Sequence, residues 1–265
     1  MTTQDKTRTI CITGATSGIG RASAYIFAEN GYRLLLIARR KERLEQLKDE
    51  LNKRFNANVD IRCLDVRDYS ALKEELADVL EGKTEIDLLL NNAGLALGLK
   101  GIDEGELTHW NQMIDTNIKG VLHMTKIAVP GMKKRKKGHI INIASIAGKE
   151  VYPNGNVYCA TKHAVEALTK AMRIDLLPYN IRVGQVAPGH VEDTEFALVR
   201  FEGDRDKAQI YQDFNPVKSS DIAEIIYFMA TRPSHVNIQD VLVTGTQQAS
   251  ATILQRNGRI FDVPQ

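Results

Sequence analysis

Three side chains capable of acid–base chemistry occur in order at Ser145, Tyr158 and Lys162. The tyrosine and the lysine are four residues apart, so on a helix both side chains point to one face. Tyrosine ordinarily titrates at a pKa of about 10. A neighbouring ammonium stabilises the phenolate and lowers that pKa, so the pair can pass a proton to or from an alcohol oxygen. Such pairs also arise by chance on helix surfaces, and this one gains significance from the serine 13 residues earlier.

Two further residues are candidates for the same site, each with an ordinary structural alternative. Asn117 lies in the helical stretch 115–120, where we expect it either to hold a water behind the lysine or to satisfy a helix kink or cap. Arg200 lies in the segment 194–204, and its guanidinium can bind a substrate carboxylate in a bidentate way. The alternative is a solvated arginine on a lid helix. The expected substrate contacts are therefore Ser145, Tyr158 and Arg200.

A glycine-rich turn, TGATSGIG at 13–20, follows the first apolar run and leads directly into a helical pattern. Glycines permit a tight turn and let a pyrophosphate approach the backbone, and the following helix offers free N–H groups to that anion. A turn that only packs a helix on a sheet is the alternative. The sequence predicts a dinucleotide phosphate site with contacts at Gly14, Thr16, Ser17, Gly18, Ile19 and Gly20.

Arg39 and Arg40 follow the second apolar run, with no carboxylate beside them. At this place in dinucleotide sites an acidic residue bonds the adenosine ribose, whereas arginine accommodates a 2′-phosphate. The pair therefore favours NADP over NAD. A surface charge at a helix start is the alternative for either arginine alone.

The ends of the third and fourth apolar runs carry further candidate coenzyme contacts. A carboxylate at Asp65 can accept a hydrogen bond from the adenine amino group, and a glycine at position 94 permits close approach of the backbone to the ribose. The predicted contacts at these two ends are Asp65, Val66, Asn92, Ala93 and Gly94.

Apolar runs alternate with helical periods along the whole chain. The runs are expected to be strands over 10–12, 34–38, 59–63, 86–90, 139–143, 181–186 and 236–243. Near-continuous apolar runs suit parallel strands that helices cover on both faces. The pattern predicts an α/β, doubly wound fold in which one domain spans 1–265 around a parallel sheet of about seven strands. The ends of its strands would bring the candidate residues together.

Composition excludes several other classes of protein. The chain has 265 residues and a formal net charge of +2, which favours neither a nucleic-acid partner nor a membrane surface. The cysteines at 11, 63 and 159 form no CxxC pair, which is typical of reduced thiols and indicates no metal site. No apolar run approaches the roughly 18 residues that span a bilayer. We therefore expect a cytoplasmic protein.

With these motifs in place, the chain resembles the compact type of short-chain dehydrogenase/reductase. The matching elements, in the family's order, are TGATSGIG (13–20), NNAG (91–94), Asn117, Ser145, YCATK (158–162) and PG (188–189). The resemblance implies that Ser145 orients and polarises a substrate carbonyl and that Tyr158 donates or accepts the proton. It implies that Lys162 lowers the tyrosine pKa and binds the nicotinamide ribose, and that Asn117 sustains a proton relay.

The resemblance also implies that the loop 188–196 covers the nicotinamide amide. The coenzyme contacts implied at this end are Tyr158, Lys162, Pro188, Gly189, Val191 and Thr194. Thr194 stands one residue later than in the commonest PGxVxT form. The glycine turn also lacks the basic residue found in some members, so a preference for NADP depends on Arg39 and Arg40.

A narrower resemblance is to the NADP-dependent 3-hydroxy acid dehydrogenases, a group that includes enzymes oxidising L-allo-threonine, serine and 3-hydroxypropionate-type compounds. The similar strings are GLALG (94–98), MIDTNIKG (113–120), GNVY (155–158), TEFALVRFEGD (194–204) and HVNI (235–238). Members of the family are usually tetramers joined through helices around 106–131 and 158–176. The resemblance therefore implies a homotetramer.

Three hypotheses for function follow. The leading one is an NADP-dependent oxidoreductase that acts on the alcohol or ketone of a small 3-hydroxy acid such as serine, allo-threonine or 3-hydroxypropionate. The second is a general carbonyl or 3-ketoacyl reductase, and the two differ in whether a carboxylate anchor lies near Ser145. The third is a non-catalytic NADP-sensing protein, although such proteins usually lose the Tyr–Lys pair that is intact here.

Overall fold

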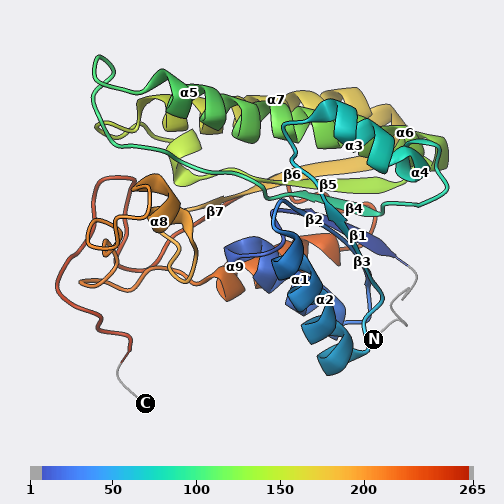
Figure 1. The fold of residues 1–265 in the computed structure, drawn as a ribbon, viewed down its shortest axis with the longest axis horizontal. Coiled ribbons are helices and arrows are strands. Elements are labelled where there is room, and N and C mark those ends of the chain that lie inside the picture. Colours follow the sequence, from blue (N-terminus) through green and yellow to red (C-terminus); the bar gives the residue numbers. More distant parts are fainter. Residues whose placement is uncertain (1–7, 263–265) are drawn as a thin grey trace.

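The computed structural model describes residues 8–262, which fold around a sheet of seven parallel strands (Figure 1). The strands lie in the order β3-β2-β1-β4-β5-β6-β7, and every neighbouring pair is parallel. Their bounds are β1 (Thr9–Thr13), β2 (Arg33–Ala38), β3 (Val59–Cys63), β4 (Leu88–Asn91), β5 (Gly138–Ile143), β6 (Ile181–Pro188) and β7 (Asp240–Val243). The predicted doubly wound α/β fold is therefore confirmed.

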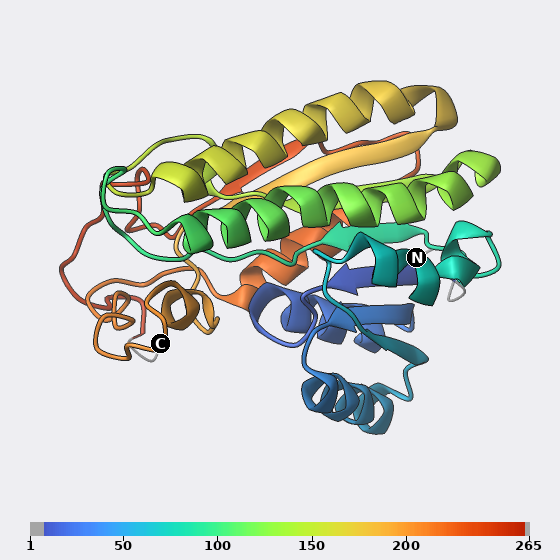
Figure 2. The same ribbon diagram turned by 45° about the horizontal axis from the view of Figure 1, so that its top comes forward.

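Helices cover both faces of this sheet, as the turned view in Figure 2 makes clear. Helices α1, α2 and α9 pack on one face, and α3, α4, α6 and α7 pack on the other. The helix bounds are α1 (Gly18–Glu29), α2 (Lys41–Phe55), α3 (Tyr69–Glu75), α4 (Ala77–Leu80), α5 (Leu107–Ile114), α6 (Gly120–Arg135), α7 (Asn156–Leu176), α8 (Phe196–Arg200) and α9 (Ser219–Ala230). Within residues 8–262, no helix has the length and apolar character needed to cross a membrane.

Successive residues of the central strands belong to different hydrophobic cores. On β1, Ile10 and Ile12 pack in the core that contains Phe27 of α1, whereas Cys11 packs with Met124 of α6. Side chains alternate between the two faces of a strand, so a strand covered on both faces has to be apolar throughout. This explains why the central strands appear in the sequence as unbroken apolar runs.

Two strands begin later than the sequence predicts. The predicted strand over 86–90 begins at Leu88, and before it the Asp87 carboxylate accepts from the backbone N–H of Thr9 while the Asp87 N–H donates to the Thr9 carbonyl, each at 2.9 Å. The predicted strand over 236–243 begins at Asp240. There the carbonyl of Val236 accepts a hydrogen bond from Arg182 Nη1 at 3.0 Å and belongs to the turn that precedes the strand. An apolar run marks burial rather than strand bounds, and the backbone pairing runs one residue beyond the assigned strands: the His139 N–H donates to the Asp87 carbonyl at 2.9 Å and the Gln185 N–H donates to the Gln239 carbonyl at 3.0 Å.

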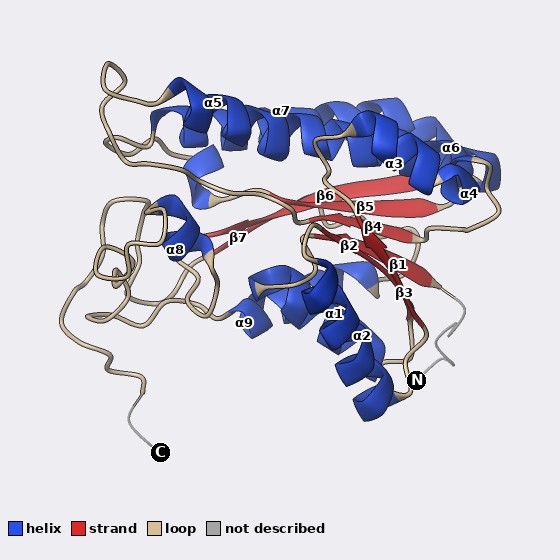
Figure 3. Cartoon of the chain, in the orientation of Figure 1, coloured by secondary structure: helices blue, strands red, loops and turns tan. Residues whose placement is uncertain are grey.

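Strand order reverses at β1, which lies between β2 and β4. In an open parallel sheet such a reversal opens a crevice at the carboxyl ends of the strands, where ligands bind. The glycine-rich turn, Asn92 and Ser145 all follow strands at this edge. Figure 3 shows that the long loops after β6 and β7 gather beyond the same edge, beside α8.

Candidate active site

The glycine-rich turn has the backbone geometry that the phosphate prediction requires. Gly14 and Gly18 adopt positive φ angles of 65° and 49°, a region that favours glycine. A Cβ atom on Gly20 would lie 2.4 Å from the Gly14 carbonyl oxygen, so α1 can approach the turn only with a glycine there. Of the six predicted contacts, five line the cavity described next, and Gly20 instead lies packed beneath the turn. Gly20 therefore shapes the phosphate site without facing it.

A cavity of about 630 Å³ runs across the carboxyl edge of the sheet. One end is formed by Arg39 and Arg40, and the other by Ser145, Tyr158 and Lys162. The sequence-predicted residues that line it between these ends are Asp65, Val66, Asn92, Ala93, Gly94, Pro188, Gly189, Val191 and Thr194. A single cavity therefore connects the candidate coenzyme residues to the candidate catalytic residues.

Thr13 and Asn92 fasten the glycine turn to the end of β4. Asn92 Nδ2 donates to the carbonyl oxygens of Thr13 at 2.9 Å and Gly14 at 3.2 Å. The backbone N–H groups of Asn92 and Ala93 both donate to Thr13 Oγ1 at 3.0 Å. This bracing role of Asn92 is not evident from the sequence, where it stands only as a coenzyme contact. The one signal for Thr13 is a polar residue at the end of an apolar strand.

Thr194, whose position departs by one residue from the common family form, lies over the glycine turn. A Cβ atom on Gly18 would lie 2.9 Å from Thr194 Cγ2, so the two segments are in close contact. Thr194 Oγ1 donates to the Val191 carbonyl oxygen at 3.3 Å. The shifted threonine therefore still lines the cavity.

The end of the cavity predicted to hold the adenosine is strongly polar. Arg40 Nη2 lies 3.2 Å from Thr16 Oγ1 and 2.7 Å from Glu195 Oε2. Asp65 pairs with Arg67 at 2.6 Å. Burial opposes ionisation of Asp65, but the hydrogen bonds from Arg67 outweigh it and lower the pKa of the carboxyl. An ionised Asp65 retains acceptor capacity for a ligand amino group.

The three candidate catalytic side chains are buried at the other end. Helix α7 begins at Asn156, so Tyr158 and Lys162 lie in its first two turns on one face. Ser145 Oγ accepts from the Ala147 N–H at 3.1 Å and donates to the Pro188 carbonyl at 3.4 Å. Ser145, Tyr158 and Lys162 are 9%, 8% and 6% exposed, so bulk water has little access to any of them.

The structure does not show the expected lowering of the Tyr158 pKa by Lys162. Burial raises the pKa of Tyr158, Tyr152 adds to that effect, and a hydrogen bond with Ser145 and the charge of Arg200 oppose it. The Lys162 ammonium donates to the Ile143 carbonyl at 2.8 Å and lies 5.9 Å from the centre of the Tyr158 ring. Burial also lowers the pKa of Lys162 to about 8. The sequence-based expectation was wrong in direction because it counted the neighbouring charge and not the desolvation of the phenol.

Asn117 lies in a π-helical turn, Asp115–Lys119, between α5 and α6. Its amide is fully engaged: Oδ1 accepts from the Leu95 N–H at 2.9 Å, and Nδ2 donates to the Leu95 carbonyl at 2.8 Å and to Thr161 Oγ1 at 3.0 Å. Asn117 does not line the cavity. These contacts fit the interpretation that Asn117 satisfies a helix irregularity, and they brace the chain after β4 against α7.

Arg200 is not a solvated arginine. It lies at the end of α8, is 8% exposed and lines the cavity. Its Nη1 donates to the Tyr152 hydroxyl at 2.9 Å, and its Nε donates to the Gly98 carbonyl at 3.3 Å. The guanidinium carbon lies 5.8 Å from the centre of the Tyr158 ring. The solvated alternative is therefore wrong, and Arg200 faces the candidate catalytic tyrosine.

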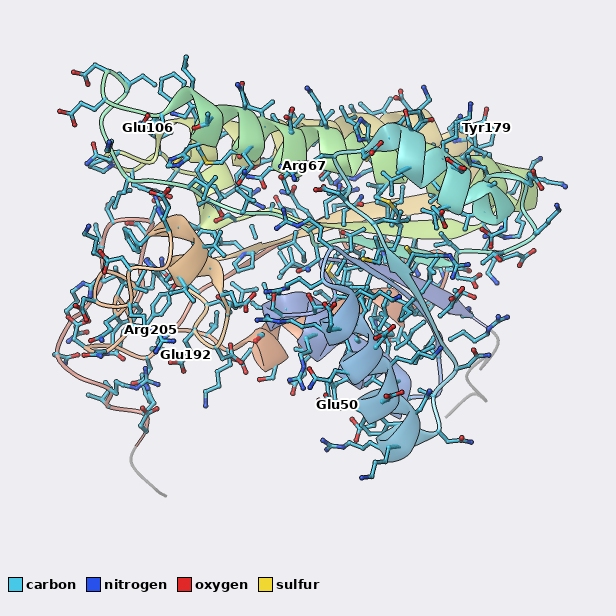
Figure 4. All side chains as sticks on the ribbon, in the orientation of Figure 1. Glu50, Arg67, Glu106, Tyr179, Glu192 and Arg205 are labelled. Atoms are coloured by element: carbon cyan, nitrogen blue, oxygen red, sulfur yellow. The ribbon has the colours of Figure 1, made fainter. Side chains whose placement is uncertain are left out.

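Several residues that the sequence does not single out individually line the same cavity as Arg200. They include Tyr152, His190, Phe196, Tyr211, Leu254 and Arg256. Most belong to irregular segments that are held by contacts between residues distant in the sequence. Arg259, for example, donates to Glu192 at 2.9 Å and so ties the C-terminal segment to the loop after β6, where Figure 4 labels Glu192. Only Tyr152 carries a signal, since it stands between Ser145 and Tyr158.

Comparison with known proteins places this fold and site in a class. Residues 8–204 match the family described as short chain dehydrogenase. The chain belongs to the short-chain dehydrogenase family, and its predicted membership is confirmed. It is accordingly an oxidoreductase, as the tyrosine–lysine pair beside a dinucleotide-type cavity indicates.

Individual proteins similar to this chain have names that state a particular activity. NADP-dependent 3-hydroxy acid dehydrogenase YdfG of Salmonella typhi is 44% identical over 243 residues, which cover 91% of this chain and 96% of that protein. Sulfoacetaldehyde reductase 2 of Chromohalobacter salexigens is 42% identical over 242 residues, covering 91% and 95%. The solved closed form of serine dehydrogenase complexed with NADP+ is 41% identical to this chain, with a TM-score of 0.86. The match covers 92% of this chain and 97% of that one.

Proposed function

We propose that this protein is an NADP-dependent dehydrogenase that interconverts the alcohol and the carbonyl form of a small 3-hydroxy acid. The observation that carries the proposal is the continuous cavity. It joins two arginines at one end to a buried serine, tyrosine and lysine at the other, and Arg200 faces the tyrosine. Relatives named for 3-hydroxy acids and serine support the choice of substrate class.

The residues of the cavity fit NADP along its length. Gly14, Ser17 and Gly18 line the cavity, so a pyrophosphate could approach the backbone of the turn there. Arg39 and Arg40 would meet the 2′-phosphate, and Asp65 and Gly94 would face the adenine and a ribose. When bound, NADP supplies the nicotinamide carbon that accepts or returns the hydride.

The side chains at the far end would handle the substrate oxygen and its proton. Ser145 Oγ has a rotatable hydroxyl hydrogen and would donate to that oxygen. During reduction the Tyr158 hydroxyl would donate its proton to the carbonyl oxygen and become a phenolate, and during oxidation the phenolate would accept the alcohol proton. With a raised pKa, Tyr158 holds its proton at neutral pH, which suits carbonyl reduction. Lys162 would bind the nicotinamide ribose. Asn117 would hold the segment at Leu95 against helix α7, which carries Lys162.

Arg200 would bind the substrate carboxylate. Its guanidinium is planar, buried and held by Tyr152 through Nη1 and by Gly98 through Nε, so its remaining N–H groups can engage a carboxylate in a fixed orientation. That orientation would decide which carbon of the acid faces Tyr158. A sulfonate could use the same donors, in keeping with the relative named for sulfoacetaldehyde.

A screen of NADP+ reduction tests the proposal. The substrates are serine, allo-threonine, 3-hydroxybutyrate, 3-hydroxypropionate and simple secondary alcohols of similar size. We expect one or more hydroxy acids to have a kcat/KM at least about tenfold above that of the neutral alcohols, because an added charge-assisted hydrogen bond is worth about 1.5–3 kcal/mol. Equal efficiency on hydroxy acids and neutral alcohols would favour a general carbonyl reductase.

The proposal includes a single-domain, cytoplasmic homotetramer. Three free cysteines, of which Cys63 is exposed, suit a reducing compartment. The helices expected to join subunits carry exposed apolar side chains at Leu107, Leu122 and Ile174, which suit burial in an interface. Light scattering of the purified protein should give about four times the mass of one chain.

A further inference from the structure

Lys149 lies four residues after Ser145, at the end of the short 3-10 turn Ile146–Gly148. Ser145 begins this turn. Its Oγ accepts from the Ala147 N–H at 3.1 Å, and its carbonyl accepts from the Gly148 N–H at 2.8 Å. Because the turn is short and bonded within itself, a displacement at Lys149 is passed on to Ser145.

The Lys149 ammonium joins this turn to α7. Its Nζ lies 3.0 Å from Glu166 Oε2 and also pairs with Asp240, the first residue of β7. Burial opposes the charge of Lys149, but its hydrogen bonds to Asp240 and Glu166 outweigh burial and raise the pKa of the ammonium. Tyr158, Lys162 and Glu166 are spaced four residues apart on α7, so they lie on one face of that helix. Lys149 therefore grips the helix face that carries the candidate catalytic pair.

Packing and the ion pair oppose different motions of the turn. A Cβ atom on Gly148 would lie 2.7 Å from the Lys162 carbonyl oxygen, so the turn already lies as close to α7 as its backbone permits. Such packing stops the turn from approaching the helix but does not stop it from moving away. The attraction between Lys149 and Glu166 opposes that separation. The side chains are 21% and 16% exposed, so this pair is better shielded from water than an ordinary surface pair.

Ser145 thus lies between two lysine contacts. Before it, Lys162 Nζ donates to the Ile143 carbonyl at 2.8 Å. After it, Lys149 is paired with Glu166. In the proposed function Lys162 also binds the nicotinamide ribose, so its contact with Ile143 is shared with the coenzyme. Lys149 does not line the cavity, so its contact does not depend on the coenzyme.

We propose that Lys149 is a positioning residue: through Glu166 it holds Ser145 at the distance from Tyr158 at which both hydroxyls can meet one substrate oxygen. This inference rests on the proposed function, in which Ser145 and Tyr158 act on that oxygen. Small displacements of a reacting group lower the rate steeply. Loss of Lys149 should therefore lower turnover by way of Ser145 and leave coenzyme binding unchanged.

The test is a double-mutant cycle of Lys149→Met, Ser145→Ala and the two replacements together. Met keeps an unbranched side chain and removes the charge. Lys170→Met is the matched control, since Lys170 pairs with the same Glu166 at 2.7 Å but lies on α7 itself and is 60% exposed. Steady-state kinetics measure kcat and KM with the hydroxy acid that wild type uses best in the screen above. Fluorescence titration measures the affinity for NADPH.

We expect Lys149→Met to lower kcat about tenfold, while the KM for NADP+ and the affinity for NADPH stay near those of wild type. In the Ser145→Ala chain the same replacement should cause no further loss, because the group that Lys149 positions is absent. Lys149→Arg keeps the charge and should have a kcat within about threefold of wild type. Lys170→Met should match wild type throughout.

A normal kcat of Lys149→Met, or a tenfold loss that persists in the Ser145→Ala chain, would overturn the positioning role alone. Equal losses in Lys149→Arg and Lys149→Met would overturn it as well. Glu166→Gln removes the opposite charge and should lower kcat with the same dependence on Ser145, which keeps the cycle usable if Lys149→Met does not fold. If wild type turned over no substrate of the screen, the proposed function would be wrong, and this inference with it.

Discussion

The two walls of the cavity are built by different means. One wall consists of strand ends and the start of α7: the turn after β1, Asn92 after β4 and Ser145 after β5 are each fixed within a residue or two of a ladder, and Tyr158 lies in the first turn of α7. The other wall follows β6 and consists of α8 and irregular segments up to residue 256. The first wall presents the residues proposed for proton transfer and most of those proposed for coenzyme binding. The second wall presents the coenzyme contacts after β6 and the residues proposed for substrate recognition.

The second wall is held together by side chains from distant parts of the sequence. Arg259 pairs with Glu192, and Arg256 pairs with Asp213. Glu195 pairs with Arg40, which is 155 residues away. Partly exposed ion pairs of this kind contribute little each, so this wall can move at low cost. The difference suggests that chemistry depends on the rigid wall and that substrate choice and access depend on the adjustable one. Variants of each wall should therefore fail in different ways.

The largest effect is expected on the rigid wall, at Tyr158. Replacing Tyr158 with Phe keeps the ring against Phe196 and removes the hydroxyl proposed to transfer the proton. Turnover should fall by about 10²–10⁴-fold, while the affinity for NADPH, measured by fluorescence titration, stays near that of wild type. Tyr179→Phe, in the short helical turn after α7 where Figure 4 labels Tyr179, is the control and should have normal turnover. Near-normal turnover of Tyr158→Phe at neutral pH would remove Tyr158 from the mechanism.

The second-largest effect is expected on coenzyme selection, when Arg39 and Arg40 are both replaced by Ala. Two charge-assisted bonds of about 1.5–3 kcal/mol each amount to on the order of a hundredfold in the KM for NADP. The KM for NAD should change much less, since NAD has no 2′-phosphate. Lys53→Ala, at the exposed end of α2, serves as the control for removal of positive charge. A parallel rise in both KM values would mean that these arginines only support the fold.

A variant of the adjustable wall should change substrate preference and leave the chemistry intact. We expect Arg200→Met to raise the KM for a hydroxy acid by about tenfold or more, because one charge-assisted hydrogen-bond partner is lost. A neutral alcohol of similar size should be affected far less. Steady-state kinetics with both substrates at saturating NADP+ make the comparison. Equal losses on the two substrates would show that Arg200 only packs against Tyr152.

The smallest effect concerns stability and its dependence on pH. Burial lowers the pKa of Lys162 to about 8 from an ordinary value of 10.5. Between those two pH values Lys162 is protonated in the unfolded chain and neutral in the folded one, so the free energy of unfolding should rise with pH across that window. Below pH 8 the folded protein carries the full cost of burying the charged ammonium. Lys162→Met removes the penalty and should be more stable than wild type at pH 7 by about 1–2 kcal/mol.

Urea unfolding of both proteins at several pH values measures this difference. The advantage of Lys162→Met should shrink from pH 8 upward and vanish near pH 10.5. A lysine variant that is less stable at pH 7, or a difference that stays constant with pH, would show that the ammonium is not strained by burial.

The two walls also differ in how much of their structure could be predicted from the sequence. The bounds of β3 at 59–63 are as predicted, and so is the doubly wound sheet, because apolar periodicity and glycine placement are local signals. The coenzyme-side residues line one cavity, since strand order alone brings strand ends together. The Glu195 contacts and Tyr211 were missed, because pairing over long sequence distances leaves no local pattern. The direction of the Tyr158 pKa shift was also missed, because it depends on burial, which only the packed structure reveals.

The most direct test of the central claim is the coenzyme preference of the unmodified protein. The claim is that one cavity joins a 2′-phosphate site to the tyrosine–lysine pair, so kcat/KM for NADP+ and NAD+ should be measured with the same saturating hydroxy acid. We predict that NADP+ is used on the order of a hundredfold more efficiently, with most of the difference in KM. Equal efficiency with the two coenzymes would contradict the account.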